Sequence, residues 1–262
     1  MQALRTAATG MAAQQLNVEV ISNNIANMNT IGFKRQRAEF QDLLYQTLIT
    51  PGAQSSDQGT VVPTGVQVGM GVKSGSTYRI TTQGALTRTD NKLDLAIDGP
   101  GFFQVLMPSG ETAYTRAGNL ATNDQGQLVT EDGYQIQPAI TIPPGVRSIT
   151  ISASGQIEVS TDGQTAPQIL GQLELATFVN EAGLEAIGNN LLKESGASGS
   201  ATTGTPGSTG IGTLVQGYTE ASNVDAVSEI TQLIVAQRAY EMNSKVISTA
   251  DQMLSVASQL KS

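Results

Sequence analysis

Residues Ser222–Ser262 read SNVDAVSEITQLIVAQRAYEMNSKVISTADQMLSVASQLKS, without a glycine or a proline. Mostly apolar residues recur every seven positions, and a second series follows three residues behind. The first series is Leu233, Tyr240, Ile247 and Leu254, the second is Ala236, Asn243, Ala250 and Ala257, and Val246, Met253 and Leu260 widen the stripe. This spacing predicts one helix over residues 223–260, roughly 55 Å long, with an apolar seam of the coiled-coil type. Ser222 or Asn223 is the expected N-cap.

The beginning of the chain carries the same pattern. Its seam series are Leu4, Met11, Val18 and Ile25, followed by Ala7, Gln14, Ile21 and Met28. The pattern predicts a helix over residues 2–28, which Gly10 weakens by about 1 kcal/mol relative to alanine. An asparagine-rich run and then Gly32 signal its end.

The two terminal seams complement each other although the whole middle of the chain separates them. Each helix alone is marginal in water. We therefore expect them to pair with each other, with neighbouring subunits, or both, as a coiled-coil-like domain of residues 1–30 and 223–262. The simpler alternative is a helix pair that closes an ordinary domain.

The asparagines near the helix ends allow two interpretations. Asparagine caps helices, and a buried polar residue can also fix the register between packed helices of different subunits. The residues that we expect at an assembly interface are Leu4, Met11, Val18, Ile21, Asn23, Asn24, Ile25, Asn27, Leu233, Tyr240, Asn243, Ile247 and Leu254.

The middle of the chain is predicted to be rich in β-structure, which makes the fold class α+β. Short alternating segments lie between closely spaced turn signals over residues 73–222, as in a β-sandwich or a barrel-like domain. In KLDLAIDG, Lys92–Gly99, the alternation assigns Asp94, Ala96 and Asp98 to the solvent face. Residues 31–72 are expected to connect the domains, with a short helix or strand in AEFQDLLYQTLI. The Gly/Ser/Thr-rich stretch 195–213 is predicted to be a flexible loop.

Composition excludes several classes of chemistry. The chain has no cysteine and no histidine, so thiolate metal sites and Ser–His–Asp catalysis are impossible. Asp94 and Asp98 are more typical of a strand's solvent face than of a catalytic or Ca²⁺ site. We therefore expect no enzyme activity, no cofactor, no metal and no small-molecule substrate.

Charge and hydropathy also limit the partners. A net charge of −8 disfavours nucleic acid, and the cluster of Lys34, Arg35 and Arg37 reads as a solvated or interface face. No stretch approaches the about 20 apolar residues of a membrane span. No signal-peptide pattern is visible, so any export is expected to use a route without a cleaved signal.

Several segments together resemble the flagellar rod and hook protein family. At the N-terminus the resemblance rests on VISNNIANMNTIGFKRQRAEFQDLLYQ, Val20–Gln46. At the C-terminus it rests on Ser222–Leu254, including QRAYE at Gln237–Glu241. Between them the matching segments are Leu93–Val105, Ala113–Asn119 and Gly126–Pro138.

The resemblance implies a structural subunit that polymerises into a helical tube. Lys34–Lys73, Gly183–Leu192 and the chain length are similar to those of distal-rod members, which implies a drive shaft that transmits motor torque to the hook. Implied partners are further copies of the chain, proximal rod proteins, the hook protein, the P-ring and L-ring proteins and the flagellar type III export apparatus. The implied location is the basal body, in the rod that crosses the periplasm towards the outer membrane. The alternatives are a proximal rod subunit, or an extracellular fibre or adhesin module.

Overall fold

The computed structural model describes residues 2–52, 63–161 and 166–259, which form two compact units. Unit 1 combines the two ends of the chain with residues 36–78, and unit 2 consists of residues 26–35 and 79–224. The described structure has two long helices and a β-rich middle, so the predicted α+β class is confirmed.

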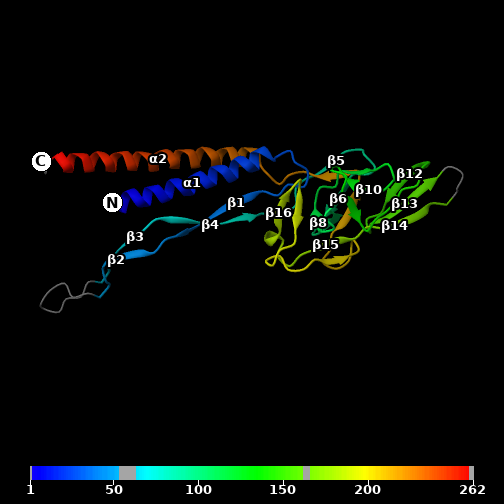
Figure 1. The fold of residues 1–262 in the computed structure, drawn as a ribbon, viewed down its shortest axis with the longest axis horizontal. Helices are drawn as coiled ribbons and strands as arrows, with labels where there is room; N and C mark the ends of the chain where they lie inside the picture. Colours follow the sequence, from blue (N-terminus) through cyan, green and yellow to red (C-terminus); the bar gives the residue numbers. More distant parts are fainter. Residues whose placement is uncertain (1, 53–62, 162–165, 260–262) are drawn as a thin grey trace. The chain divides into compact units, whose positions relative to one another are not determined.

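Unit 1 contains the two terminal helices, α1 (Gln2–Ala26) and α2 (Ala226–Gln259). Near the end of α1, Asn24 Nδ2 donates to Glu229 Oε2 near the start of α2, over 3.0 Å. Further along, a β-carbon on Gly10 would lie 3.1 Å from Asn243 Nδ2. The two helices therefore lie side by side and antiparallel (Figure 1). The close approach of Asn243 explains why glycine stands in mid-helix at position 10 despite its cost.

Both helices have somewhat different ends from those predicted. α1 stops at Ala26, so Met28 lies beyond the helix and is exposed. The N-cap of α2 is Asp225, whose Oδ1 accepts the Ser228 N–H at 2.8 Å, and not Ser222 or Asn223. Sequence alone could not separate these candidates, because serine, asparagine and aspartate all cap helices well.

The segment AEFQDLLYQTLI, Ala38–Ile49, for which the sequence predicts a short helix or strand, forms strands. β1 (Gln36–Asp42) pairs with β4 (Val72–Arg79), and β2 (Tyr45–Ile49) pairs antiparallel with β3 (Val66–Gly69). Thr9 Oγ1 of α1 accepts the Val72 N–H at 3.3 Å, which places the start of β4 against the helix.

Unit 2 is built on one nine-stranded sheet among the described residues. Seven strands follow each other in the order β16 (Glu185–Gly188), β17 (Leu191–Lys193), β8 (Thr112–Thr115), β7 (Phe102–Leu106), β11 (Gln135–Gln137), β10 (Leu128–Thr130) and β9 (Leu120–Thr122). β15 (Leu175–Thr177) pairs with both β7 and β18 (Thr202–Gly204), and the short 3-10 helix η1 (Glu181–Gly183) follows β15.

Smaller sheets complete unit 2. One has three strands, β12 (Val146–Ile151), β13 (Gln156–Thr161) and β14 (Gln168–Gln172). The other two pair β6 (Leu95–Asp98) with β19 (Thr213–Gln216), and β5 (Leu86–Arg88) with β20 (Tyr218–Glu220). The C-terminal part of the unit therefore supplies partner strands to segments more than a hundred positions earlier in the chain.

Two apolar clusters hold unit 2 together. The larger includes Leu95, Phe103, Val105 and Leu175, all fully buried. In the smaller, the rings of Tyr114 and Phe178 pack edge to face with centroids 4.8 Å apart. Phe103 and Val105 come from β7 and Tyr114 from β8, two adjacent strands of the large sheet, and burial of these side chains fixes the register of the strands that carry them.

One prediction for unit 2 is wrong in detail. Leu95, Ala96 and Ile97 of β6 are all buried, and so is Asp94, so this strand has no solvent face over that stretch. Asp94 instead accepts a hydrogen bond from Asn91 Nδ2 at 2.8 Å. The stretch 195–213, predicted to be a flexible loop, contains β18 and the buried Ser198, whose hydroxyl donates to the Ser195 carbonyl at 2.9 Å.

Candidate functional site

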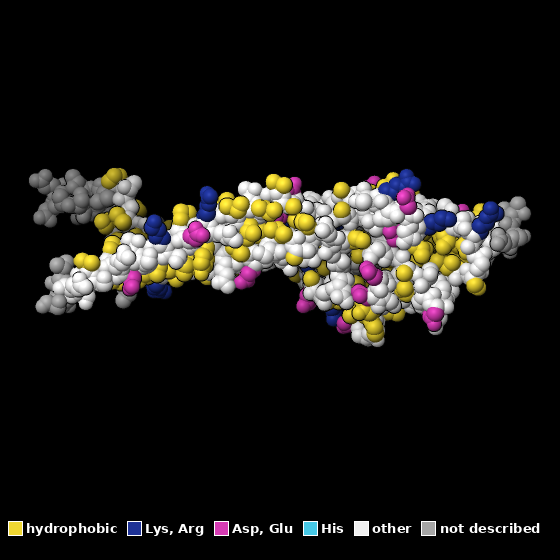
Figure 2. Space-filling view, turned by 90° about the horizontal axis from the view of Figure 1, so that it is seen from above, with side chains coloured by type: hydrophobic (Ala, Val, Ile, Leu, Met, Phe, Trp, Pro, Cys, Tyr) yellow, Lys and Arg dark blue, Asp and Glu magenta, His cyan; other side chains and the backbone are white. Residues whose placement is uncertain are grey.

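The exposed apolar surface of α2 is the first candidate site. Four residues spaced by seven, four and seven positions lie on one side of the helix, and we call them the α2 outer stripe. They are Val235, Met242, Val246 and Met253, with exposed fractions of 62%, 65%, 47% and 62%. Figure 2 shows hydrophobic side chains grouped along the helical part of unit 1.

Further exposed apolar residues surround the same helix. Val227, Ile230 and Ile234 lie on another side of α2 and are also exposed. A helix on the surface of a globular protein usually has one apolar stripe, whereas α2 has exposed apolar residues on more than one side. α2 therefore carries more apolar surface than its pairing with α1 covers.

The predicted seam of α2 divides between buried and exposed residues. Ala236 and Ala250 are buried, and Leu233, Asn243 and Ile247 are partly buried. Tyr240 and Leu254 remain exposed, at 42% and 45%. The side chain of Ala257 and residue Leu260 lie outside the described part of the chain.

The predicted seam of α1 is more uniformly covered. Ala7 and Ile21 are buried. Leu4, Met11, Val18 and Ile25 are each partly buried. α1 contacts both α2 and the start of β4, which explains why little of its apolar surface is left free.

Asn24 forms contacts within the chain. Its side chain is buried, accepts the Gln36 N–H at 2.9 Å and donates to the Gln36 carbonyl at 2.8 Å and to Glu229. Asn24 therefore ties α1 to residue 36 and to α2. Asn27 accepts the Thr30 N–H through its carbonyl at 3.2 Å, as expected at the end of a helix.

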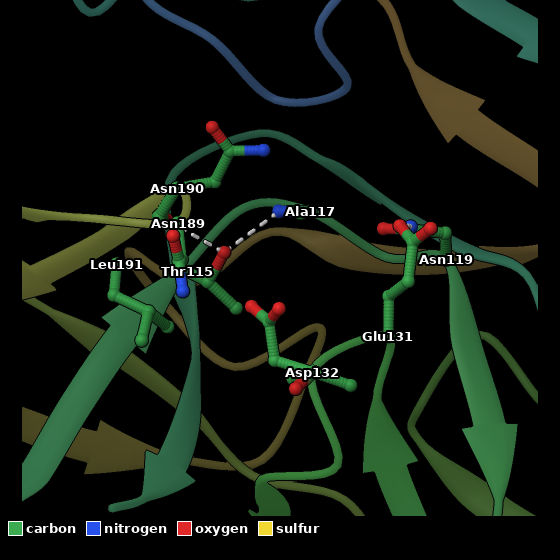
Figure 3. Close-up of a pocket in the computed structure, with 9 residues that line it drawn as sticks. Thr115, Ala117, Asn119, Glu131, Asp132, Asn189, Asn190 and Leu191 are labelled. Atoms are coloured by element: carbon green, nitrogen blue, oxygen red, sulfur yellow. Dashed lines mark hydrogen bonds between the residues drawn. The ribbon is translucent and has the colours of Figure 1, made fainter.

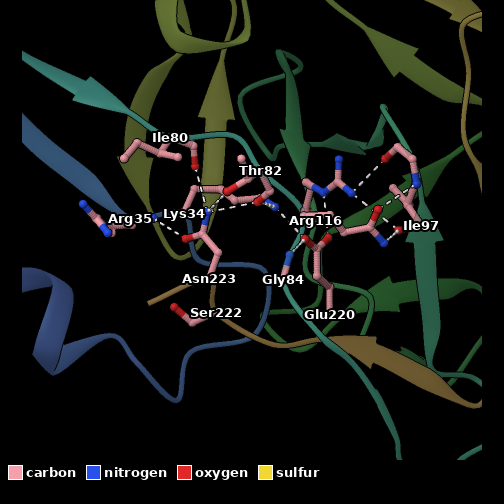
Figure 4. A network of polar contacts seen from close by, with 12 residues as sticks. Lys34, Arg35, Ile80, Thr82, Gly84, Ile97, Arg116, Glu220, Ser222 and Asn223 are labelled. Carbon is pink, nitrogen blue, oxygen red and sulfur yellow. Dashed lines mark hydrogen bonds and ion pairs between the residues drawn. The ribbon is translucent and has the colours of Figure 1, made fainter. Parts of the chain in front are cut away.

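A buried charged network in unit 2 is the second candidate site (Figure 4). Glu220 accepts from Lys34 Nζ at 2.5 Å through Oε1 and from Arg116 Nε at 2.7 Å through Oε2. The side chains of all three residues are at most 6% exposed. The Gly84 N–H also donates to Oε1, at 2.8 Å, and Lys34 Nζ donates to the Thr82 carbonyl at 2.9 Å.

Carbonyl oxygens complete the environment of Arg116. Its guanidinium donates to the carbonyls of Gly101 at 3.1 Å, Gly99 at 3.0 Å and Ile97 at 3.4 Å. Its Cζ atom lies 5.8 Å from the centroid of the Phe102 ring, within cation–π range. The planar fork of donors suits this set of fixed acceptors better than a lysine would.

Burial and charge act in opposite directions on Glu220. Burial would raise the pKa of its carboxyl, but Arg116, Lys34 and the Gly84 N–H together hold that pKa below the ordinary value. For Lys34, burial and then the charge of Arg116 lower the pKa, and Glu220 only partly opposes them. The network thus keeps a buried carboxylate ionised between two cations.

Acidification is therefore expected to destabilise unit 2 through Glu220. The folded pKa lies below the ordinary 4.5, so the stabilisation is complete above that pH and is lost as the pH falls through the folded pKa. Urea unfolding midpoints of unit 2, measured from pH 7 down to pH 3, check this. Glu220→Gln should remove this part of the acid dependence, and identical profiles for both proteins would contradict the assignment.

Asn223 joins the same network. Its Oδ1 accepts the Arg35 N–H at 2.7 Å, and its Nδ2 donates to the carbonyls of Ile80 and Thr82 at 2.9 and 3.0 Å. Asn223, the alternative N-cap predicted for the C-terminal helix, thus connects three segments of unit 2 instead.

Segments distant in sequence meet in this network: Lys34–Arg35, Ile80–Gly84, Ile97–Gly101, Arg116 and Glu220–Asn223. The interpretation of Lys34 as part of a solvated or interface face is wrong, because its ammonium group is buried against Glu220. Arg37, by contrast, is exposed and pairs with Glu39 at 2.6 Å. Sequence reasoning missed Glu220 because a single acidic residue gives no periodic signal.

A polar pocket of about 210 Å³ in unit 2 is lined in part by Thr115 and Ala117, the residues on either side of Arg116 (Figure 3). Its lining includes Thr115, Asn119, Glu131, Asp132 and Asn190. Glu131 already accepts from Asn119 Nδ2 at 2.8 Å. Across residues 2–52, 63–161 and 166–259, no three acidic residues lie close enough together to hold a metal ion.

Neither described helix is long and apolar enough to cross a lipid bilayer.

Comparisons with known proteins match both ends and the middle of the chain. Residues 4–34 match a family described as flagella basal body rod protein, and residues 215–260 match the C-terminal region of flagellar basal body rod FlgEFG proteins. Residues 96–159 match the D1 domain of the flagellar hook protein FlgE/F/G family.

Curated relatives match over nearly the full length. A flagellar basal-body rod protein FlgG of Caulobacter vibrioides is 72% identical over 262 residues, which is 100% of both chains. Proteins of the same description from Buchnera aphidicola subsp. Acyrthosiphon pisum and Bacillus subtilis are 53% and 40% identical. They cover 96% and 100% of this chain, and 96% and 99% of their own lengths.

Proposed function

We infer the role of this chain from one premise: it belongs to the flagellar basal-body rod protein family. It is a structural subunit of the distal rod of the bacterial flagellar basal body. The full-length identity to FlgG proteins carries this conclusion. In this role the chain polymerises into a helical tube that works as a drive shaft and transmits torque to the hook.

Assembly proceeds through the terminal helices in this proposal. The observation that supports it is the α2 outer stripe, where four large apolar side chains remain at least 47% exposed in the single chain. Exposed apolar surface of this kind marks an interaction site. A contact between different patches of identical subunits repeats without closing and gives a helical filament.

The predicted interface residues divide into two roles under this proposal. The partly buried Leu4, Met11, Val18, Ile25, Leu233 and Ile247, with the buried Ile21, pair the two helices in a coiled-coil-like manner. The exposed Tyr240 and Leu254 face neighbouring subunits, as does the exposed side chain of Asn23. Asn24, Asn27 and Asn243 instead make contacts within the chain. The β-rich residues then form the outer part of the tube.

The partners and the location follow from the same role. We place this chain in the rod across the periplasm, between proximal rod proteins and the hook protein and inside the P-ring and L-ring. It reaches that place through the flagellar type III export apparatus, without cleavage of a signal peptide. These partners rest on the family, since the structure contains a single chain.

Electron microscopy of basal bodies from a strain that lacks this gene tests the proposed function. The expected result is a shortened rod without a hook, which returns to full length when the gene is restored. Complete rods that carry hooks in the deletion strain would overturn the assignment to the distal rod.

A further inference from the structure

The buried network has an order along the chain that the rod function does not explain. Lys34 precedes the large sheet of unit 2, Arg116 follows directly after β8, and Glu220 ends β20. The two cations therefore come from early and middle segments, and the carboxylate that contacts both comes from the last strand of the unit.

Without Glu220, the remaining partners do not balance the buried charge. Lys34 would keep the Thr82 carbonyl, and Arg116 would keep the carbonyls of Gly101, Gly99 and Ile97. Carbonyl dipoles satisfy hydrogen bonds, but two cations within reach of one carboxylate would then repel each other in a poorly solvated site. Removing one partner from a buried ion pair is strongly destabilising, because the other charge stays buried.

The segment that carries Glu220 also completes the sheets of unit 2. β19 pairs with β6, and β20 pairs with β5. The Gly32 N–H donates to the Glu220 carbonyl at 2.8 Å, and the Ala221 N–H donates to the Ala85 carbonyl at 2.9 Å. Docking of residues 213–224 thus supplies strand pairing, main-chain hydrogen bonds and charge neutralisation at the same time.

We propose that Glu220 is a completion lock, which makes the stable fold of unit 2 conditional on the docking of residues 213–224. While that segment is detached, burial of Lys34 and Arg116 is unfavourable, so the large sheet does not stay closed. One consequence rests on the proposed function. A subunit remains unfolded, as export requires, until residues 213–224 are free to dock.

Native-state hydrogen exchange of the purified full-length chain tests the lock. In the wild type, the amides of the β5–β20 and β6–β19 pairs should exchange through the same global opening as the amides of the β7–β8 pair. In Glu220→Gln, protection should fall by a common factor of about 100 or more in all three pairs, because the two cations lose their carboxylate.

Glu111→Gln is the matched control. Glu111 pairs with Lys193 at 2.8 Å in the same unit, but both side chains are at least 40% exposed. Loss of such a surface ion pair should change protection by no more than about fivefold.

Two outcomes would overturn the lock. In Glu220→Gln, faster exchange confined to residues 213–224 and their direct partners would make Glu220 a local contact only. In the wild type, a partial opening that releases β19 and β20 while β7–β8 stays protected would also contradict the lock. This second test does not require the variant to fold.

A triple variant, Lys34→Met, Arg116→Met and Glu220→Met, gives an independent check. It removes all three charges, so protection of β7–β8 should return towards that of the wild type, since apolar replacement of a complete buried ion cluster is often tolerated. β19 and β20 should then open separately, and failure of both effects would contradict the lock. All of these measurements use the isolated chain, so they remain valid whatever the microscopy of rods shows.

Discussion

Val235→Asp is expected to abolish tube formation by the purified chain while leaving both units folded. Val235 is 62% exposed in the single chain, so the substitution disturbs little packing within unit 1. In an assembled tube the same position would be covered by a neighbouring subunit, and an aspartate there would be a buried, unpaired charge.

The expected size of the effect follows from two contributions. Loss of the valine contact costs about 1.5–3 kcal/mol, and burial of an unpaired charge costs several kcal/mol more. A total of at least about 4 kcal/mol per interface corresponds to a rise of roughly a thousandfold in the concentration needed for assembly. Sedimentation and negative-stain microscopy measure this concentration.

Gln237→Asp is the matched control for that variant. Gln237 is also exposed, and two residues correspond to about 200° around the helix, so it lies on another side of α2. The control variant introduces the same residue, aspartate, with the same helix propensity. If both variants assemble like the wild type, the α2 outer stripe is not an interface.

Gly118→Ala is expected to destabilise unit 2 by about 3 kcal/mol, at the upper end of the usual cost of overpacking. A β-carbon at this position would lie 1.6 Å from the Leu95 carbonyl oxygen, a backbone atom at the start of β6. The Leu95 N–H also donates to the Gly118 carbonyl at 2.9 Å, so the two segments cannot separate without losing that bond.

The same clash would displace Arg116, two residues earlier in the chain, from Glu220. Chemical unfolding monitored by circular dichroism measures the loss of stability. Gly196→Ala is the control, because no atom lies within 4 Å of a β-carbon there, and its unfolding midpoint should change little. Equal midpoints for the two variants would contradict the close approach of Gly118 and Leu95.

The terminal helices could be predicted from sequence because burial against each other imposes a seven-residue period. Ala236 and Ala250 show this most clearly, since both belong to the predicted seam and both are buried. Tyr240 and Leu254 belong to the same seven-residue series but remain exposed, because α1 covers only part of the predicted seam of α2. Periodicity thus reveals an apolar face without showing which neighbour covers it.

The buried network could not be predicted, because its members do not share a local pattern. Lys34 lies in a basic cluster of the kind usually found on a surface, and Arg37 of that cluster is indeed exposed. The Glu220 carboxylate, which pairs with the buried Lys34, lies 186 residues away in sequence. Long-range pairing of single charges gives no signal in one sequence.

The strand β6 shows a related limit. Alternation assigned Ala96 to the solvent, but β19 and the surrounding core bury it completely. Alternation is a reliable guide only for a strand with one covered face, because a strand covered on both faces reads as a nearly continuous apolar run. Asp94 is tolerated there because Asn91 supplies a hydrogen bond.

The central claim is that assembly buries the α2 outer stripe, and cysteine labelling tests it most directly. The chain contains no cysteine, so Met242→Cys reports on one position alone. We expect a maleimide to react rapidly with this variant as a monomer and to leave it unmodified in assembled rods. Equally fast labelling in monomers and in intact rods would show that the stripe faces solvent, and would contradict assembly through this face of the terminal helix.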